Sequence, residues 1–251
     1  MSTGEALLVA LAGVGAGLTG SVAGLASLIS YPALLATGLP PLAANVTNTT
    51  SMLGNAVGTT IGSRRELVGQ WRRLRTLMVL CGAGGSVGAT LLLVTDPSVF
   101  EAVVPWLVAL GALLLLLGDR LRAWSLARRR EPTTASRWRG HLVVASIGVY
   151  GGYFGAGAGI IMLAALALRT TEPLAVTNAV KNVTTSTANL VAALAYMVVA
   201  PVDWAAAAAL ASGSLVGGWI GPQLVRVLPE KPLRIGIGLA GLGLAAYLLL
   251  A

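Results

Sequence analysis

The segment GVGAGLTGSVAG, residues 13–24, decides the fold, because it recurs in the second half of the chain as GVYGGYFGAGAG, residues 148–159. When the two segments are aligned without a gap, Gly17, Gly20 and Gly24 of the first fall on glycines of the second. A second pair of segments follows in the same order: PLAANVTNTTSMLGN from Pro41 and PLAVTNAVKNVTTSTAN from Pro173. Two pairs of matching segments that occur in the same order in both halves indicate an internal duplication.

The composition excludes most soluble classes of protein. Of 251 residues, 56% are hydrophobic and 10% are charged, against about 25% charged residues in ordinary soluble domains. A soluble enzyme, a nucleic-acid-binding domain and a disordered chain are therefore excluded. One cysteine and one histidine leave no internal disulfide, CxxC site or histidine-based metal cluster. We expect a helical integral membrane protein with no cofactor and no metal.

Eight apolar stretches can be recognised, and two of them differ from the rest. The first and the fifth are long, and each carries a glycine cluster near its middle. The main polar segment, 119–140, is rich in arginine, and we interpret it as a basic cytoplasmic linker between two membrane repeats, 1–118 and 141–251. The apolar stretches are 5–38, 41–61, 74–94, 100–118, 141–169, 173–199, 203–225 and 232–251.

Two topologies fit this pattern, and the placement of charge distinguishes them. If every stretch crosses once, the repeats are parallel, and Arg169 and Arg226 fall on the opposite face from 119–140. If the first and fifth stretches are re-entrant hairpins, the halves are inverted, and sixteen of the 17 Lys and Arg residues lie on one face, as the positive-inside rule requires. We therefore expect an all-α polytopic membrane protein of two inverted repeats, each a re-entrant glycine-tipped hairpin plus three transmembrane helices. Eight simple transmembrane helices in parallel repeats are the alternative.

The glycine clusters are interpreted as the tips of the hairpins. Glycine permits a sharp reversal and a close approach of the backbone to a ligand. A helix restarts behind each tip, and its N–H groups and positive dipole end favour an anion in the middle of the membrane. The glycines could instead allow close packing between helices, but the recurrence of the glycine cluster in both halves favours the interpretation as hairpin tips. The residues predicted here to bind substrate are Gly20, Ser21, Gly24, Gly155 and Gly157.

Polar stripes follow each hairpin. At about 100° per residue, an arc of roughly 80° on 41–61 holds Asn45, Asn48, Met52 and Asn55. An arc of roughly 100° on 173–199 holds Asn178, Lys181, Asn182, Thr185 and Asn189. Such stripes face protein or a cavity, either for a shared site or for interhelical hydrogen bonds. Lys181 is the one ionisable residue deep in an apolar stretch, and an ionisable residue in such a position is taken to be functional. The alternative is that its side chain extends to the membrane interface. The predicted substrate-binding residues on these stripes are Asn45, Asn48, Asn178, Lys181, Asn182 and Thr185.

These motifs resemble the TauE/SafE family of sulfite and organosulfonate exporters. The resemblance rests on the duplicated glycine-rich segments, GLTGSVAGLASLISYPALLATGLP from Gly17 and GYFGAGAGIIMLAALAL from Gly152. Each is followed by a polar helix, LAANVTNTTS or LAVTNAVKNVTTS. The resemblance covers nearly the whole chain and implies transport of a sulfur-containing anion such as sulfite, thiosulfate or a sulfonate.

The function expected from the sequence is secondary transport of such an anion, outward across the cytoplasmic (inner) membrane, with the anion held at the midplane between the repeats. An anion channel and a non-catalytic membrane assembly subunit are the alternatives. We expect no enzyme, because the stretches offer no paired acids, no Ser/His pair and no metal ligands. The expected partners are a small anionic substrate and the lipid bilayer, with no nucleic acid; a homodimer is left open.

Overall fold

The computed structural model describes residues 1–127, 134–170, 172–224 and 230–250. Five helices in these ranges are long and apolar enough to cross a membrane: α1, α4, α5, α8 and α9. The expected all-α membrane fold is thereby confirmed, and the chain is a multi-pass membrane protein. The described ranges form ten α-helices and no strand: α1 Thr3–Ala23, α2 Ser27–Ala36, α3 Pro41–Gly62, α4 Trp71–Val94, α5 Pro97–Ala127, α6 Thr134–Tyr153, α7 Ala158–Ala167, α8 Leu174–Val199, α9 Trp204–Leu224 and α10 Glu230–Leu250.

Both long apolar stretches are broken into a pair of helices that pack against each other. The first break follows Gly24, whose φ of 76° closes α1 in the left-handed region, where only glycine is unstrained. The second break lies between α6 and α7, where Gly155 and Gly157 have φ of 77° and 78°. The breaks predicted from the glycine clusters are therefore present, although they are shorter than predicted, since Gly17 and Gly152 still lie inside helices.

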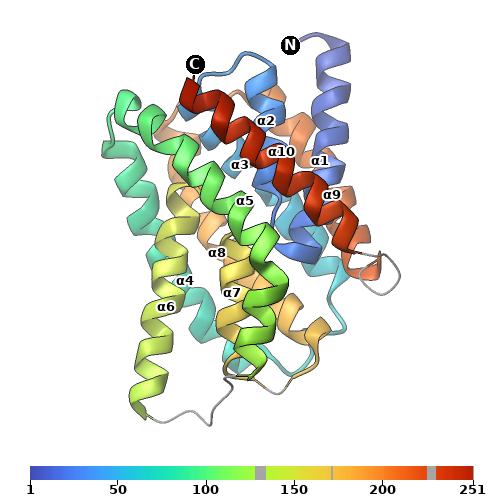
Figure 1. Cartoon of the computed structure of the whole chain (residues 1–251), viewed down its shortest axis with the longest axis vertical. Helices are drawn as coiled ribbons and strands as arrows, with labels where there is room; N and C mark the ends of the chain where they lie inside the picture. The colour runs from blue at the N-terminus through green and yellow to red at the C-terminus, as the bar shows by residue number, and fades with distance from the viewer. Residues whose placement is uncertain (128–133, 171, 225–229, 251) are drawn as a thin grey trace.

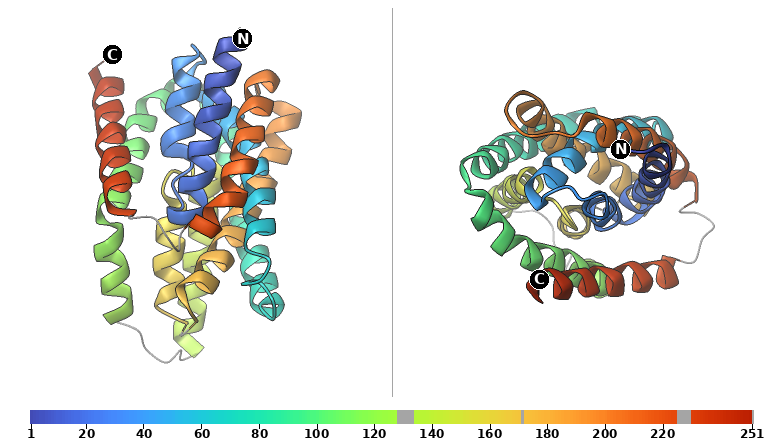
Figure 2. Two further views of the ribbon diagram at one scale, coloured as in Figure 1. Left: turned by 90° about the vertical axis from the view of Figure 1, so that its right-hand side faces the viewer. Right: turned by 90° about the horizontal axis from the view of Figure 1, so that it is seen from above.

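The two helix pairs start from opposite ends of the bundle (Figure 1). α1 begins at the end where the N-terminus lies, whereas α6 begins at the other end, close to the connections between α3 and α4 and between α7 and α8. Figure 2 shows α10 and α5 side by side on one flank of the bundle. This arrangement is compatible with inverted repeats, which remain a prediction about the orientation in the membrane.

α3 shows why hydropathy alone underestimates the number of membrane helices. Its 22 residues rise about 33 Å, which is enough to cross a hydrocarbon core of about 30 Å. Its polar residues from Asn45 to Ser51 are all buried in the protein. A helix whose polar face is covered by other helices can cross the membrane although its mean hydropathy is low.

The first helix of each half packs on the fourth helix of the other half, so α1 contacts α9 and α6 contacts α4. Glycines make both contacts close. A Cβ on Gly17 would collide with the carbonyl of Ser214 on α9, and one on Gly152 would collide with the carbonyl of Gly85 on α4. Close packing is therefore the role of the glycines before each break, while those at the breaks shape the tips.

The basic segment 119–140 is more helical than a linker. α5 continues to Ala127 and α6 starts at Thr134, because arginine, alanine and leucine are strong helix formers. Residues 128–133 lie outside the described residues. The boundaries at 118 and 141 thus fall within helices, and the halves interlock instead of forming separate bodies.

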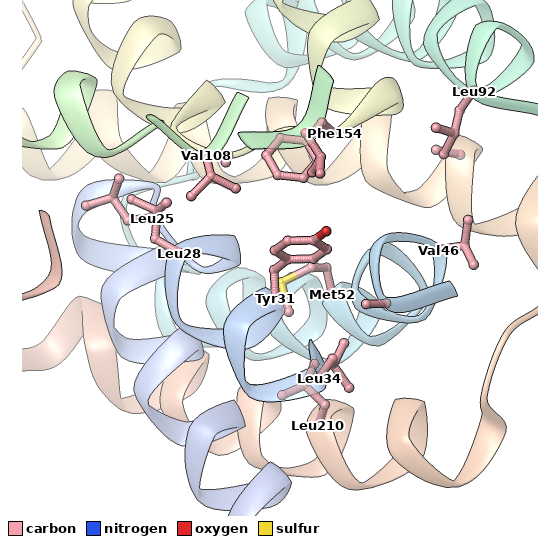
Figure 3. Packing of buried hydrophobic residues seen from close by; sticks show 14 of the residues in the cluster. Leu25, Leu28, Tyr31, Leu34, Val46, Met52, Leu92, Val108, Phe154 and Leu210 are labelled. Atoms are coloured by element: carbon pink, nitrogen blue, oxygen red, sulfur yellow. The ribbon is translucent and has the colours of Figure 1, made fainter. Parts of the chain in front are cut away.

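A hydrophobic cluster joins the first hairpin to the second (Figure 3). Tyr31 of α2 meets Phe154 edge to face, with ring centroids 5.4 Å apart, a favoured aromatic geometry. Leu25 and Leu28 lie beside them, and all four side chains are almost completely buried. The apolar core therefore fixes the broken ends of the two hairpins against each other.

The two termini lie at one end of the bundle and the α3–α4 connection lies at the other. This arrangement predicts which residues can be labelled from each side of the membrane. In a Cys81→Ala background, Ser2→Cys and Val68→Cys should react with a membrane-impermeant maleimide from opposite sides of a sealed vesicle. Both positions are exposed, so reactivity reports the side and not burial. Reaction of both from the same side would contradict the inverted topology.

Candidate anion site

A small cavity lies where the two broken helix pairs meet. Its volume is about 50 Å³, room for roughly three water molecules at ~15 Å³ each or for one compact oxyanion. Both hairpins and both polar helices contribute to the wall. The lining residues are Gly20, Gly24, Ala26, Ser27, Met52, Asn55, Cys81, Ile147, Gly151, Gly155, Ala158, Gly159, Asn182, Thr185, Ser186, Ala188 and Asn189.

The two hairpin tips touch through backbone atoms at this cavity. A Cβ added to Gly24 would lie 2.5 Å from the Cα of Gly159, a separation that real Cβ atoms do not adopt. No side chain fits between the tips, so glycine is required on both sides. The contact brings the start of α2 and the start of α7 to the same place.

The start of each returning helix is open toward the cavity. Neither α2 nor α7 has a hydrogen bond from a side chain at its N-cap, and Ser27, Ala158 and Gly159 from their first turns line the cavity. Several N–H groups of these first turns donate to carbonyls of the preceding turn, such as Leu28 to Leu25 and Ala158 to Gly155, but the N-terminus of a helix still carries a partial positive charge. Two such ends at one small cavity create a positive potential that favours an anion.

The broken end of α1 is held by side chains of α8. Asn178 and Asn182 each donate from Nδ2 to the carbonyl oxygen of Ser21, at 2.8 and 3.0 Å. Lys181 donates from Nζ to the carbonyl oxygen of Gly20 at 3.4 Å. These carbonyls belong to the last turn of α1, where the Gly20 carbonyl also accepts from the N–H of Gly24 at 2.8 Å and a cation is favoured by the dipole.

The broken end of α6 is held in a matching way by α3 and α8. Asn45 donates from Nδ2 to the carbonyl oxygen of Tyr153 at 3.0 Å, and the hydroxyl of Tyr196 donates to the carbonyl oxygen of Gly152. Asn48 fixes the returning helix α2, since it donates to the Ser27 hydroxyl at 3.2 Å and accepts from Ser30 at 2.5 Å. Several predicted ligands therefore act as caps.

The structure divides the eleven residues predicted to bind substrate into two layers. The cavity itself is lined by Gly20, Gly24, Gly155, Asn182 and Thr185. Behind this lining lie Ser21, Asn45, Asn48, Gly157, Asn178 and Lys181. Lys181 is completely buried, so its side chain does not snorkel to the surface of the protein.

Four polar residues of the cavity wall were not among the predicted ligands: Ser27, Asn55, Ser186 and Asn189. None of the four side chains donates a hydrogen bond to another described residue, so each can donate to a ligand. Asn55 shows this clearly, because its Nδ2 faces Gly20 whereas its Oδ1 faces Gly218 on α9. Asn55 and Asn189 lie on the polar stripes that the sequence reveals, and Ser27 is the first residue of α2.

The described part of the wall contains no carboxylate, and no three His, Cys, Asp or Glu residues gather into a metal site among the described residues. Cys81 is fully buried and is one of the residues that line the cavity. The site thus offers neutral donors, two helix N-termini and, one layer behind, the ammonium of Lys181. That combination suits a compact anion.

Comparison with known proteins gives a consistent result. The family model described as "Sulfite exporter TauE/SafE" matches residues 9–248. A "Probable membrane transporter protein" of Haemophilus influenzae is 29% identical over 240 residues, which cover 93% of this chain and 91% of the relative. The "Probable membrane transporter protein YfcA" of Escherichia coli K12 is 27% identical over 234 residues, covering 93% and 86%.

The contact between the tips predicts the effect of adding one methyl group. Gly24→Ala or Gly159→Ala must push the tips apart, since carbon atoms need roughly 3.5–4 Å. Alkylation of Cys81 by a small thiol reagent should therefore become faster. Gly15→Ala is the matched control, because a Cβ there makes an ordinary contact of 3.7 Å with Ile29. An unchanged Cys81 rate in a folded Gly24→Ala protein would show that the tips do not close the cavity.

Proposed function

The chain belongs to the TauE/SafE family, and from this membership we propose that it is a secondary transporter that carries a small sulfur-containing anion across the membrane. The observation that carries the proposal is the small polar cavity between two opposed helix starts. Broken helices that meet near the midplane are the recurring substrate site of secondary transporters. The anion is proposed to bind there, between the two halves of the chain.

The charges around the cavity support an anionic substrate. The wall carries amide and hydroxyl donors and the starts of α2 and α7, and no carboxylate stands among its described residues. Lys181 places an ammonium behind Gly20, to whose carbonyl it donates. In a region of low dielectric such a charge acts strongly on an anion a few ångströms away.

The volume of the cavity supports a compact substrate. A space of about 50 Å³ suits a tetrahedral or pyramidal oxyanion of a few heavy atoms, such as sulfite, better than a large organic sulfonate. The oxygen atoms of such an anion accept charge-assisted hydrogen bonds from several directions. The donors Asn55, Asn189, Ser27 and Ser186 come from three helices that surround the cavity, which fits this requirement.

Outward transport is the proposed direction. The positive-inside rule places the arginine-rich loops on the cytoplasmic side of the inner membrane. The cytoplasm is electrically negative relative to the outside of the cell. Moving one negative charge outward then gains about 2.3 kcal/mol per 100 mV. An exporter of this kind needs no coupling ion, and no carboxylate of the described cavity wall stands ready for a proton relay.

A transporter accounts for the closed centre better than a channel does. A channel requires a continuous pore, whereas the tips at Gly24 and Gly159 are in backbone contact. The cavity is small and lies between helix pairs that start from opposite ends of the bundle. Movement of one hairpin at a time would expose the cavity to one side, as alternating access requires.

Flux into proteoliposomes tests the function and the site together. Purified protein should carry labelled sulfite, thiosulfate or a simple sulfonate at a saturable rate. Asn55→Leu and Asn189→Leu should each weaken apparent affinity by about 10- to 150-fold, because a hydrogen bond to a charged group contributes ~1.5–3 kcal/mol. Thr90→Val is the control, since the Thr90 hydroxyl bonds only to its own helix at an exposed position.

The two possible failures of this experiment are distinct. If the parent protein carries none of the three anions, the proposed function is wrong. If the parent carries them and both asparagine variants transport with the parent's affinity, the function stands and the assignment of these donors is wrong.

Lys181 should act on both stability and anion binding. Lys181→Ala removes the bond to Gly20 and the nearest full positive charge, so we expect a lower unfolding temperature and a strongly reduced affinity. Lys181→Arg should keep part of the binding with altered selectivity, since a guanidinium is larger and forked. Thermal unfolding without anion measures the first effect, and the shift caused by added sulfite measures the second. Parent-like transport by Lys181→Ala would remove the lysine from the site.

A further inference from the structure

Two surface hollows on α3 have opposite chemistry and share one residue. The first is an apolar groove of about 510 Å³ between α3 and α8. The second is a polar pocket of about 510 Å³ at the end of α3, beside the end of α9. Ile61 lines both, so the polar pocket and the apolar groove adjoin at this residue.

The groove follows the axis of α3. Leu53, Val57 and Ile61 are spaced four residues apart and form a single apolar stripe on the helix. Val183 and Leu190 of α8 form the other side. From Ile61 to Leu53 the helix rises about 12 Å, which is close to the ~15 Å of hydrocarbon in one bilayer leaflet.

The polar pocket lies at the end of this stripe and is basic. It is lined by Arg64, Arg65, Glu66, Trp219 and Gln223 among others, so its charged residues carry a net charge of +1. Both arginines are exposed. Trp219 beside them is half exposed, as is usual for tryptophan at the level of lipid headgroups.

We infer that the two hollows together form a site for an anionic phospholipid, with its phosphate at Arg64 and Arg65 and one acyl chain along the α3–α8 groove. A free anion accounts for the arginines but not for the groove, and a neutral lipid accounts for the groove but not for the arginines. Basic pockets between membrane helices on the cytoplasmic side are the expected setting for anionic headgroups. The proposal does not depend on transport.

The position of the groove gives the lipid a structural role. Ser186 lines both the groove and the central cavity, and Met52 and Asn189 of the cavity wall are the direct neighbours of Leu53 and Leu190 in the groove. At Ser186, therefore, a single residue separates the groove from the cavity. An acyl chain in the groove covers this wall with apolar atoms and separates the cavity from the hydrocarbon.

Lipid binding by the delipidated protein in neutral detergent tests the headgroup half of the site. Native mass spectrometry should show phosphatidylglycerol retained on the order of 10-fold better than phosphatidylcholine with the same chains, given about 5-fold per arginine, reduced by Glu66. R64Q/R65Q should lower this preference to within about 2-fold. R72Q/R75Q is the matched control, because it removes two exposed cations that follow closely in the sequence but are not in the pocket lining.

The groove is tested by filling it. Val57→Trp should release both lipids at least 5-fold more easily, whereas Val79→Trp at an exposed position of α4 should not. Glycerol 3-phosphate, which has the charge without the chains, should not compete with phosphatidylglycerol.

Each contrary result overturns the lipid assignment. These results are no preference for phosphatidylglycerol in the parent, an equal loss in R72Q/R75Q, unchanged retention in Val57→Trp, or effective competition by glycerol 3-phosphate. A stable dimer that dissociates with Val57→Trp would assign the groove to a second copy of the chain instead.

Discussion

Two helices of this structure, α1 and α6, end in the interior of the helix bundle, and the rest of the structure depends on how their last carbonyl groups are hydrogen-bonded there. The last carbonyls of α1, at Gly20 and Ser21, accept hydrogen bonds from Lys181, Asn178 and Asn182. Those of α6 accept from Asn45 and Tyr196. The polar residues of α3 and α8 are thus required before any ligand is considered, and they make two broken helices stable next to an apolar core.

This constraint also divides the polar stripes into two functions. A side chain that reaches a helix end uses its donors there and faces away from the cavity, as Asn45 and Asn178 do. A side chain about three turns further along the same helix lines the cavity, as Asn55 and Asn189 do. The same residue type on the same helices therefore serves both the helix ends and the cavity wall, and Asn182, which donates to Ser21 and lines the cavity, takes part in both.

The sequence was sufficient to predict the two breaks, but not the partner of each side chain, and the substrate site remains a prediction. Duplicated glycines in over-long apolar stretches predicted two hairpins, because few other features stop a helix inside a membrane. Periodicity predicted that Asn45, Asn178 and Lys181 face inward, but it carries no information about which backbone carbonyl they meet across the bundle. The helical extension of α5 to Ala127 was missed because the clustered arginines of a solvated helix and of a linker look alike.

The geometry links the state of the cavity to the position of the hairpins. Asn182 lines the cavity and also donates to Ser21, and Gly20 lines the cavity while its carbonyl accepts from Lys181. A bound anion would therefore lie against the groups that anchor the end of α1. The tips at Gly24 and Gly159 are in backbone contact, so a shift of the first hairpin changes the packing of the second. Because close-packed contacts of this kind have few alternative arrangements, they favour discrete positions of the hairpins over gradual deformation.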